Sequence, residues 1–183
     1  MRGPLLSGAL GSPATLERVC SLVRERSPVV VLSALWLAET LASEIAVLAL
    51  VEDDKRSAAQ RALRRARKAG NRLDVVIAAA EVPLAPASVG AVVLDSLVDI
   101  EEESAARDLI VALLPALKPG AVVVSLDATK SPPLEARASE IFLASSLAKI
   151  AQARPREGAL VTTGFAPHPA VCAARFAALA SEQ

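Results

Sequence analysis

The sequence has very few aromatic residues: three phenylalanines, one tryptophan and no tyrosine among 183 residues. A folded core must therefore be built from aliphatic side chains, and the hydrophobic fraction of 53% supplies them. A net charge is also lacking, because 20 basic residues are balanced by 20 acidic ones. This balance disfavours a purely charge-driven partner, such as bulk nucleic acid or an anionic membrane. The length suits one domain with its own core.

Cysteine and histidine are scarce as well. Cys20 and Cys172 both fall on the apolar side of expected helices, which favours two small buried side chains. Two cysteines are too few for a disulfide scaffold, and together with His168, the single histidine, they lack metal-ligand spacing. No Gly-x-Ser-x-Gly elbow accompanies His168, which disfavours a serine hydrolase. The sequence thus predicts no metal, no catalytic residue and a reducing, cytoplasmic setting.

One apolar run is long enough to need a test for membrane insertion. Residues 29–51 could span a bilayer by length, but they contain Glu39 and Glu44, and a charge inside a span costs about 2.5–3.5 kcal/mol. The run fits two strands around a short helix better, so no membrane association is predicted. Residues 1–13 contain no apolar stretch of signal-peptide length. Their glycines and prolines predict a flexible arm before a single domain over residues 14–183.

The rest of the pattern alternates between the two kinds of secondary structure. Residues 29–32 form a run of β-branched and aliphatic side chains without alternation, as in a strand buried on both faces. We expect further strands over 45–51, 74–79, 91–94, 121–126, 149–153 and 160–163, and helices over 14–26, 35–43, 55–69, 102–117, 132–146 and 169–181. The alternation predicts a parallel sheet covered on both faces. Only residues 154–158 join the last two strands, and such a short link permits only an antiparallel hairpin.

Several segments resemble class I S-adenosylmethionine-dependent methyltransferases, and their order and spacing carry more weight than any one of them. These segments are Val47–Asp54, Ala80–Leu84, Ala91–Ser96 and Leu114–Gly120, within a match over residues 15–166. The resemblance implies an α/β, doubly wound, mostly parallel seven-stranded sheet that ends in an antiparallel hairpin. The loop after the first strand is glycine-rich in that family, because the backbone must turn sharply and approach the cofactor closely.

The corresponding loop here, Ser33–Glu39, has no glycine. Leu35, Trp36 and Leu37 are expected to fill the space of the cofactor's methionine part. Three alanines, 78–80, precede Glu81 where the family often has an acidic residue for the adenine. These departures predict that no cofactor is bound.

Three carboxylates keep family-like positions. Glu52 or Asp53 stands where a carboxylate would hold the ribose hydroxyls, although acidic residues at a helix N-terminus are also favoured by the helix dipole alone. Asp95, with Ser96 and Asp99, follows the fourth strand, where α/β sheets place ligands. These side chains could equally be loop carboxylates in water. If a cofactor is bound at all, Glu52, Asp53 and Asp95 are the residues expected to contact it.

The helix over 55–69 is strongly basic. Arg61, Arg64, Arg65 and Lys68 could form a surface for a partner or simply a solvated helix face. Without stacking aromatics, single-stranded nucleic acid is disfavoured as the partner. A protein partner, a homodimer included, fits better.

The predicted function is that of a non-catalytic methyltransferase-like scaffold or interaction module. One alternative is an active S-adenosylmethionine-dependent methyltransferase with an atypical pocket. Another is similarity to the N-terminal domain of anamorsin-type iron–sulfur assembly proteins, although the cysteine motifs of that family are missing here. The third alternative is a nucleic-acid binder that uses the basic helix.

Overall fold

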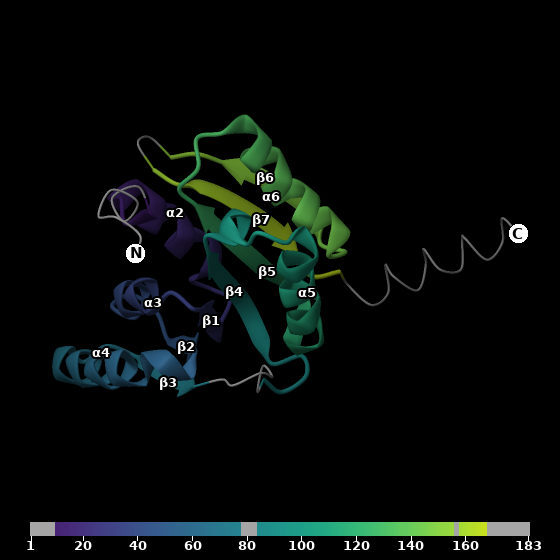
Figure 1. Ribbon diagram of the computed structural model, residues 1–183. Coiled ribbons are helices and arrows are strands. Elements are labelled where there is room, and N and C mark those ends of the chain that lie inside the picture. The colour runs from purple at the N-terminus through teal and green to yellow at the C-terminus, as the bar shows by residue number, and fades with distance from the viewer. Residues whose placement is uncertain (1–9, 78–83, 156–157, 168–183) are drawn as a thin grey trace, which may run out of the picture.

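A computed structural model of the chain describes residues 10–77, 84–155 and 158–167. Its centre is a seven-stranded sheet in the order β3-β2-β1-β4-β5-β7-β6 (Figure 1). The first five strands are parallel, and β7 runs antiparallel to both β5 and β6. The strands are β1 (Val29–Leu32), β2 (Val47–Val51), β3 (Leu73–Ile77), β4 (Val89–Asp95), β5 (Leu117–Asp127), β6 (Ala148–Ala153) and β7 (Leu160–Phe165). The predicted fold class, including the terminal hairpin, is confirmed.

Helices lie on both sides of the sheet (Figure 1). On one side are α2 (Pro13–Val23), α3 (Leu35–Leu41) and α4 (Arg56–Ala69), and on the other are α5 (Glu103–Leu113) and α6 (Pro132–Ala144). Three single-turn helices complete the described elements: η1 (Asp53–Lys55), η2 (Leu97–Asp99) and η3 (Leu114–Ala116).

The strands divide the core into two layers because successive side chains point to opposite faces. In β1, Val29 and Val31 pack with the α2–α4 side, whereas Val30 and Leu32 pack with the α5–α6 side. All four β1 side chains are buried, as the unbroken β-branched run predicted.

Local sequence signals set several helix ends. The side chain of Ser12 accepts a hydrogen bond from Thr15 N at 3.2 Å, and Pro13 occupies the first turn of α2. Gly70 ends α4 in the left-handed conformation, with φ of 74°.

The region around Pro115 differs from its prediction. The helix expected over 102–117 ends at Leu113 and continues as η3, because Pro115 cannot donate the backbone hydrogen bond of a continuing α-helix. Strand β5 begins at Leu117 rather than Ala121, since Leu117 already pairs with Val89 before a register shift. Residues 117–120 are therefore part of the strand instead of preceding it.

Two sequence predictions concern the ends of the chain. The predicted helix over 169–181 and most of the predicted N-terminal arm lie outside the described residues, so both stay predictions. Leu10, which falls in the predicted arm, is buried against the core.

The apolar run over 29–51 forms β1, α3 and β2. None of the helices in the described part of the chain has the length and hydropathy needed to cross a bilayer.

Candidate functional site

The parallel strands bring several polar side chains to one edge of the sheet. Leu32 of β1 is in register with Leu50 of β2 and with Leu94 of β4, so these three strands end side by side. Ser33, Glu52 and Asp95 follow or lie at these ends. Ligands of open α/β sheets bind at this carboxyl edge.

The turn after β1 is made without glycine. Ser33 takes the left-handed conformation, with φ of 60°, and its N–H donates to the carbonyl of Leu50 at 2.9 Å. The N–H of Ala34 then donates to the carbonyl of Leu32 at 2.7 Å, which tightens the turn. The expectation that glycine is required for this sharp turn is therefore wrong. Serine adopts this left-handed conformation at a steric cost in free energy. The hydrogen bond to the adjacent strand offsets that cost.

The three large side chains of this loop lie in different surroundings. Leu37 is fully buried in the core on the α2–α4 side, and Leu35 is partly buried against the same cluster. Trp36 is 37% exposed. The prediction that all three fill one cofactor space does not hold, because helix α3 starts at Leu35 and turns successive side chains in different directions.

Trp36 reaches across to the end of β4. Its indole Nε1 donates a hydrogen bond to Oδ2 of Asp95 at 3.4 Å, while Oδ1 of Asp95 accepts from Ser96 Oγ at 2.8 Å. The contact joins the loop after β1 to the end of β4. Both residues were singled out from the sequence, but their contact was not predicted.

The acidic residues after β2 have different surroundings. The carboxylate of Asp53 accepts from Arg56 at 2.6 Å and 3.0 Å, so it is engaged within its own helical turn. Glu52 is exposed at the start of η1 in extended backbone conformation, and its side chain makes no cap hydrogen bond. Of the two, Glu52 is the carboxylate that is available to a ligand at the end of β2.

A buried carboxylate contacts the turn that follows β4. It belongs to Asp127, which lies at the end of β5 and is fully buried. Its Oδ1 accepts from the backbone N–H of Val98 at 3.0 Å, and its Oδ2 accepts a short hydrogen bond from Ser125 Oγ. Burial raises the pKa of Asp127, and the nearby Asp99 and Asp95 raise it further, whereas the two hydrogen bonds lower it.

Asp127 therefore fixes the single turn η2 that follows Asp95. Asp127 was not predicted as a site residue, although a charged residue at the end of an apolar run was an available signal in the sequence. Ala78–Ala80 and Glu81, where the sequence departs from the acidic residue that the family often has for the adenine, lie outside the described residues.

The predicted partner residues lie on the outer side of α4. Arg61, Arg64, Arg65 and Lys68 are all exposed. Arg65 forms a two-pronged ion pair with Glu39 of α3, with both hydrogen bonds at 2.9 Å. Helix α4 packs on one face of the sheet and not at its carboxyl edge. These cations are therefore not part of the carboxyl-edge site.

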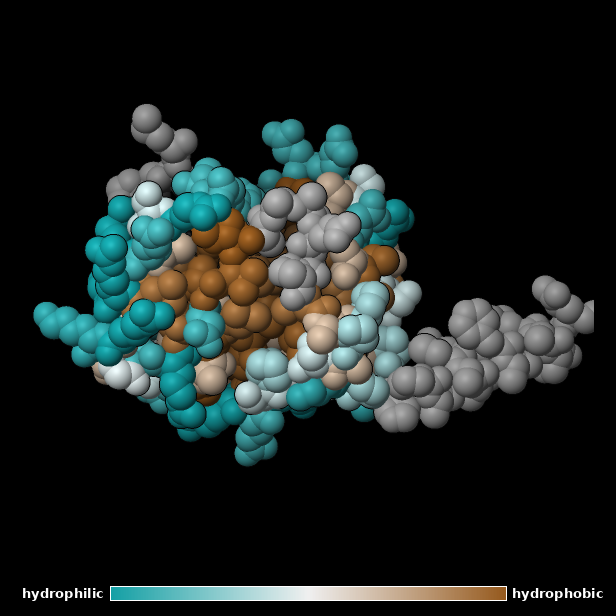
Figure 2. Space-filling view, turned by 90° about the horizontal axis from the view of Figure 1, so that it is seen from below, coloured by the Kyte–Doolittle hydropathy of each residue, from teal (hydrophilic) through white to brown (hydrophobic). Residues whose placement is uncertain are grey.

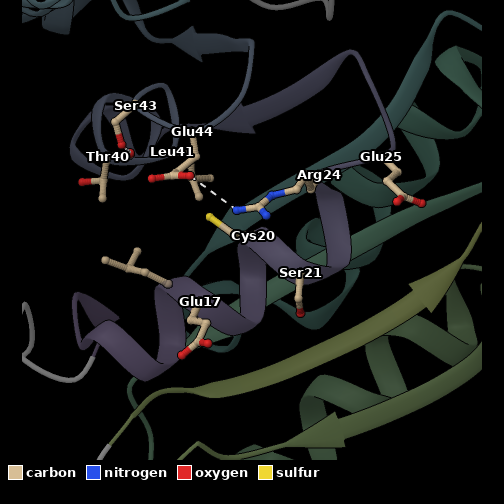
Figure 3. A pocket seen from close by; sticks show the side chains of 10 residues that line it. Glu17, Cys20, Ser21, Arg24, Glu25, Thr40, Leu41, Ser43 and Glu44 are labelled. Atoms are coloured by element: carbon tan, nitrogen blue, oxygen red, sulfur yellow. Dashed lines mark hydrogen bonds and ion pairs between the residues drawn. The ribbon is translucent and has the colours of Figure 1, made fainter.

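One hollow of the described structure lies away from this edge. It is a groove of about 550 Å³ between α2 and the end of α3. Figure 3 shows Cys20 between Arg24 and Glu44, which form an ion pair at 3.4 Å across the groove. Cys20 is half-buried rather than buried as predicted, and burial, followed by Glu44, raises the pKa of its thiol. The groove contains none of the carboxyl-edge residues.

Comparison with known proteins yields matches in structure alone. No family model and no curated protein matches the sequence. A SAM-dependent methyltransferase from Aquifex aeolicus superposes with a TM-score of 0.63 at 13% identity, covering 90% of this chain and 94% of the other. The fold is that of class I S-adenosylmethionine-dependent methyltransferases. The methyltransferase SibL, in its apo form, has a TM-score of 0.61 at 15% identity, and the match covers 84% of this chain but only 57% of SibL.

The methyltransferase fold also hosts another reaction among these matches. The [4+2]-cyclase SpnF superposes with a TM-score of 0.63 at 14% identity, covering 88% of this chain and 86% of SpnF. The fold by itself therefore does not specify the reaction.

The expectation that the chain takes no cofactor is contradicted by these comparisons. Structures with this methyltransferase fold are described as SAM-dependent, and one of them, PigF, was solved with SAH. The expectation rested on the missing glycines, whose turn Ser33 makes instead. The idea of a non-catalytic scaffold loses its main support with it.

Proposed function

We propose that this chain binds S-adenosylmethionine at the carboxyl edge of β1, β2 and β4 and acts as a methyltransferase with an atypical pocket. The observation that carries the proposal is the left-handed turn at Ser33, which turns the chain sharply after β1 without a glycine. The methyltransferase fold of the matched structures supports the choice of cofactor.

The residues at the edge suit the parts of such a cofactor. The Glu52 carboxylate is exposed at the end of β2, and a carboxylate there can accept hydrogen bonds from ribose hydroxyls. Asp95 and the indole of Trp36 lie at the ends of β4 and β1, and both groups stabilise positive charge, through a negative charge and an aromatic face respectively. When bound, S-adenosylmethionine would supply an electrophilic methyl group on a positively charged sulfur.

The atypical feature of the pocket is the contact between Trp36 and Asp95. It joins the loop after β1 to the end of β4, so a ligand that binds over these strand ends has to share or displace this hydrogen bond. Asp127 holds η2 through Val98 N, which keeps the backbone after Asp95 in place.

Cofactor binding can be tested with the protein's own fluorophore. Trp36 is the single tryptophan and the chain has no tyrosine, so its emission reports directly on the candidate site. Titration with S-adenosylmethionine and with S-adenosylhomocysteine should shift or quench this emission, and calorimetry should give the same dissociation constant. Glu52→Gln should weaken binding, whereas Glu44→Gln, in the separate groove, should leave it unchanged. Absence of both signals at millimolar ligand, with the protein folded by circular dichroism, would overturn the proposal.

Methyl transfer requires a separate test, because the same fold serves a cyclase. Release of S-adenosylhomocysteine should be measured with panels of phenols, carboxylic acids and amines as acceptors. Turnover with one class would establish the reaction, and Asp95→Asn should reduce it. If the protein binds the cofactor but methylates none of these acceptor classes, the methyl-transfer part of the proposal is wrong and only the binding part stands.

A further inference from the structure

Helix α4 carries charge of one sign only. Five arginines and one lysine, and no acidic residue, lie within its bounds. Arg61, Arg64, Arg65 and Lys68 follow the spacing i, i+3, i+4 and i+7, so they lie on one face of the helix. We call these four side chains the cationic stripe. Like charges at these spacings repel each other and destabilise a helix, so the needs of α4 itself do not explain the stripe.

The stripe is separate from the side of α4 that packs on the sheet. Ala59, Ala62 and Ala66 are buried in the core on the α2–α4 side. All four side chains of the stripe are exposed. In Figure 2, hydrophilic side chains cover much of the left part of the view, on the side where α4 lies in Figure 1. The alanines hold the helix on the sheet, and the cations face away from it.

Within the described part of the chain, one member of the stripe is engaged. Arg65 holds the carboxylate of Glu39 through two hydrogen bonds of 2.9 Å. Arg61, Arg64 and Lys68 form no ion pair or hydrogen bond with any described residue. The contact with Glu39 shows which group the stripe accepts, a carboxylate that meets the parallel N–H groups of a guanidinium. Three more cations are available to bind carboxylates in the same way.

The stripe is short and has carboxylates beyond both of its ends. From Arg61 to Lys68 the helix rises about 10.5 Å, at 1.5 Å per residue. Residues 52–54 are three exposed acidic side chains before the start of α4, and Asp74, which follows its C-terminal end, is exposed as well. A long polyanion of uniform charge, such as a nucleic acid duplex, would be repelled by these carboxylates. A short anionic segment would meet the cations alone.

The chemistry of the stripe selects the kind of partner. Helix α4 has no aromatic side chain on which a nucleic acid base could stack. Four consecutive acidic residues in an extended chain span about 10 Å, at about 3.3 Å per residue, which matches the length of the stripe. We propose that the cationic stripe docks a short run of glutamate or aspartate residues in a partner protein.

Such docking depends on several ion pairs together. Each pair between exposed side chains contributes little by itself, and salt screens it. The affinity should therefore be modest and should fall as the salt concentration rises. The docking does not require a bound cofactor, because the stripe lies on a helix that covers one face of the sheet and not at the carboxyl edge.

Anisotropy of a fluorescein-labelled peptide with four consecutive glutamates, flanked by glycine and serine, measures the docking on the full chain. We expect saturable binding with a dissociation constant below about 1 mM at low salt. Raising the NaCl concentration from about 50 mM to about 300 mM should weaken it at least about threefold, because the Debye length shortens. The same peptide with glutamine in place of glutamate should not bind.

Charge reversal on the stripe tests its part in the binding. Arg61→Glu combined with Arg64→Glu should weaken peptide binding at least about tenfold, because like charges then face each other. A glutamate at position 64 stands four residues before Lys68, a spacing that stabilises a helix, so circular dichroism should show a folded protein. The matched control, Arg18→Glu combined with Arg107→Glu, makes the same change in net charge at exposed positions of α2 and α5. It should leave peptide binding unchanged.

Three results would overturn the proposal. The first is the absence of saturable binding up to several millimolar peptide. The second is equal loss of binding in the stripe variant and in the control variant. The third is a short DNA duplex that binds more tightly than the peptide and loses affinity with the stripe variant, which would assign the stripe to nucleic acid. If the double glutamate variant does not fold, Arg61→Gln combined with Arg64→Gln takes its place.

Discussion

The indole N–H of Trp36 and the carboxylate of Asp95 connect two segments that are 59 residues apart, through a hydrogen bond of 3.4 Å. One residue follows β1 and the other ends β4, so their contact lies at the strand ends where ligands of open α/β sheets are expected to bind.

Trp36→Phe should bind S-adenosylhomocysteine more tightly than the wild type. Phenylalanine keeps an aromatic ring but cannot donate to Asp95, and a net hydrogen bond is worth about 0.5–1.5 kcal/mol. If the ligand has to break this contact, affinity should rise about two- to tenfold, measured by calorimetry. A weaker affinity would show that the indole N–H contributes to binding instead of blocking it.

Ser33→Gly should stabilise the protein by up to about 1 kcal/mol, because glycine adopts a positive φ without the steric cost that serine bears there. Urea denaturation measures the change. Ser57→Gly, at an exposed position in the first turn of α4, is the matched control and should destabilise by up to about 0.5 kcal/mol. Equal destabilisation by both substitutions would contradict a strained turn at Ser33.

Asp127→Asn should flatten the dependence of stability on pH. Since burial raises the pKa of Asp127 in the folded protein, the folded state binds this proton more tightly than the unfolded state. The wild type therefore loses stability as pH rises from the ordinary pKa of aspartate, about 3.9, through the raised value. An amide keeps an acceptor for Val98 N and does not ionise. Denaturation midpoints across this pH range check the slope, and identical slopes in both proteins would refute it.

Asp127→Ala is the contrasting substitution at the same position. It leaves the buried N–H of Val98 without its acceptor and should cost about 1–3 kcal/mol at every pH. If the alanine variant is as stable as the asparagine variant, the hydrogen bond to Val98 does not hold η2.

Gly90→Ala should destabilise the protein by about 3 kcal/mol or more. A Cβ at this position would lie 2.2 Å from the carbonyl oxygen of Arg26 and 2.6 Å from its carbon, and backbone atoms cannot move aside cheaply. Gly70→Ala provides the comparison, because a Cβ there meets nothing within 4 Å and only the positive φ is strained, at about 1–2 kcal/mol. Thermal denaturation of the two variants should rank them in this order, and the reverse ranking would contradict the close approach at Gly90.

The sequence by itself determined the order of strands and helices and the sheet they form. The unbroken run at Val29–Leu32, the short link before β7 and the cap residues Ser12 and Gly70 act through neighbours in the chain. Such local signals are readable without the fold because periodicity and caps depend on a few adjacent residues.

Only the tertiary structure decided the character of the candidate site. The left-handed turn at Ser33 is set by its hydrogen bond to Leu50 of the adjacent strand, and a missing glycine therefore misled the prediction about the cofactor. The contact of Trp36 with Asp95 and the burial of Asp127 under η2 likewise join segments far apart in the chain. Strand register decides which side chains meet, and no local pattern encodes those pairings.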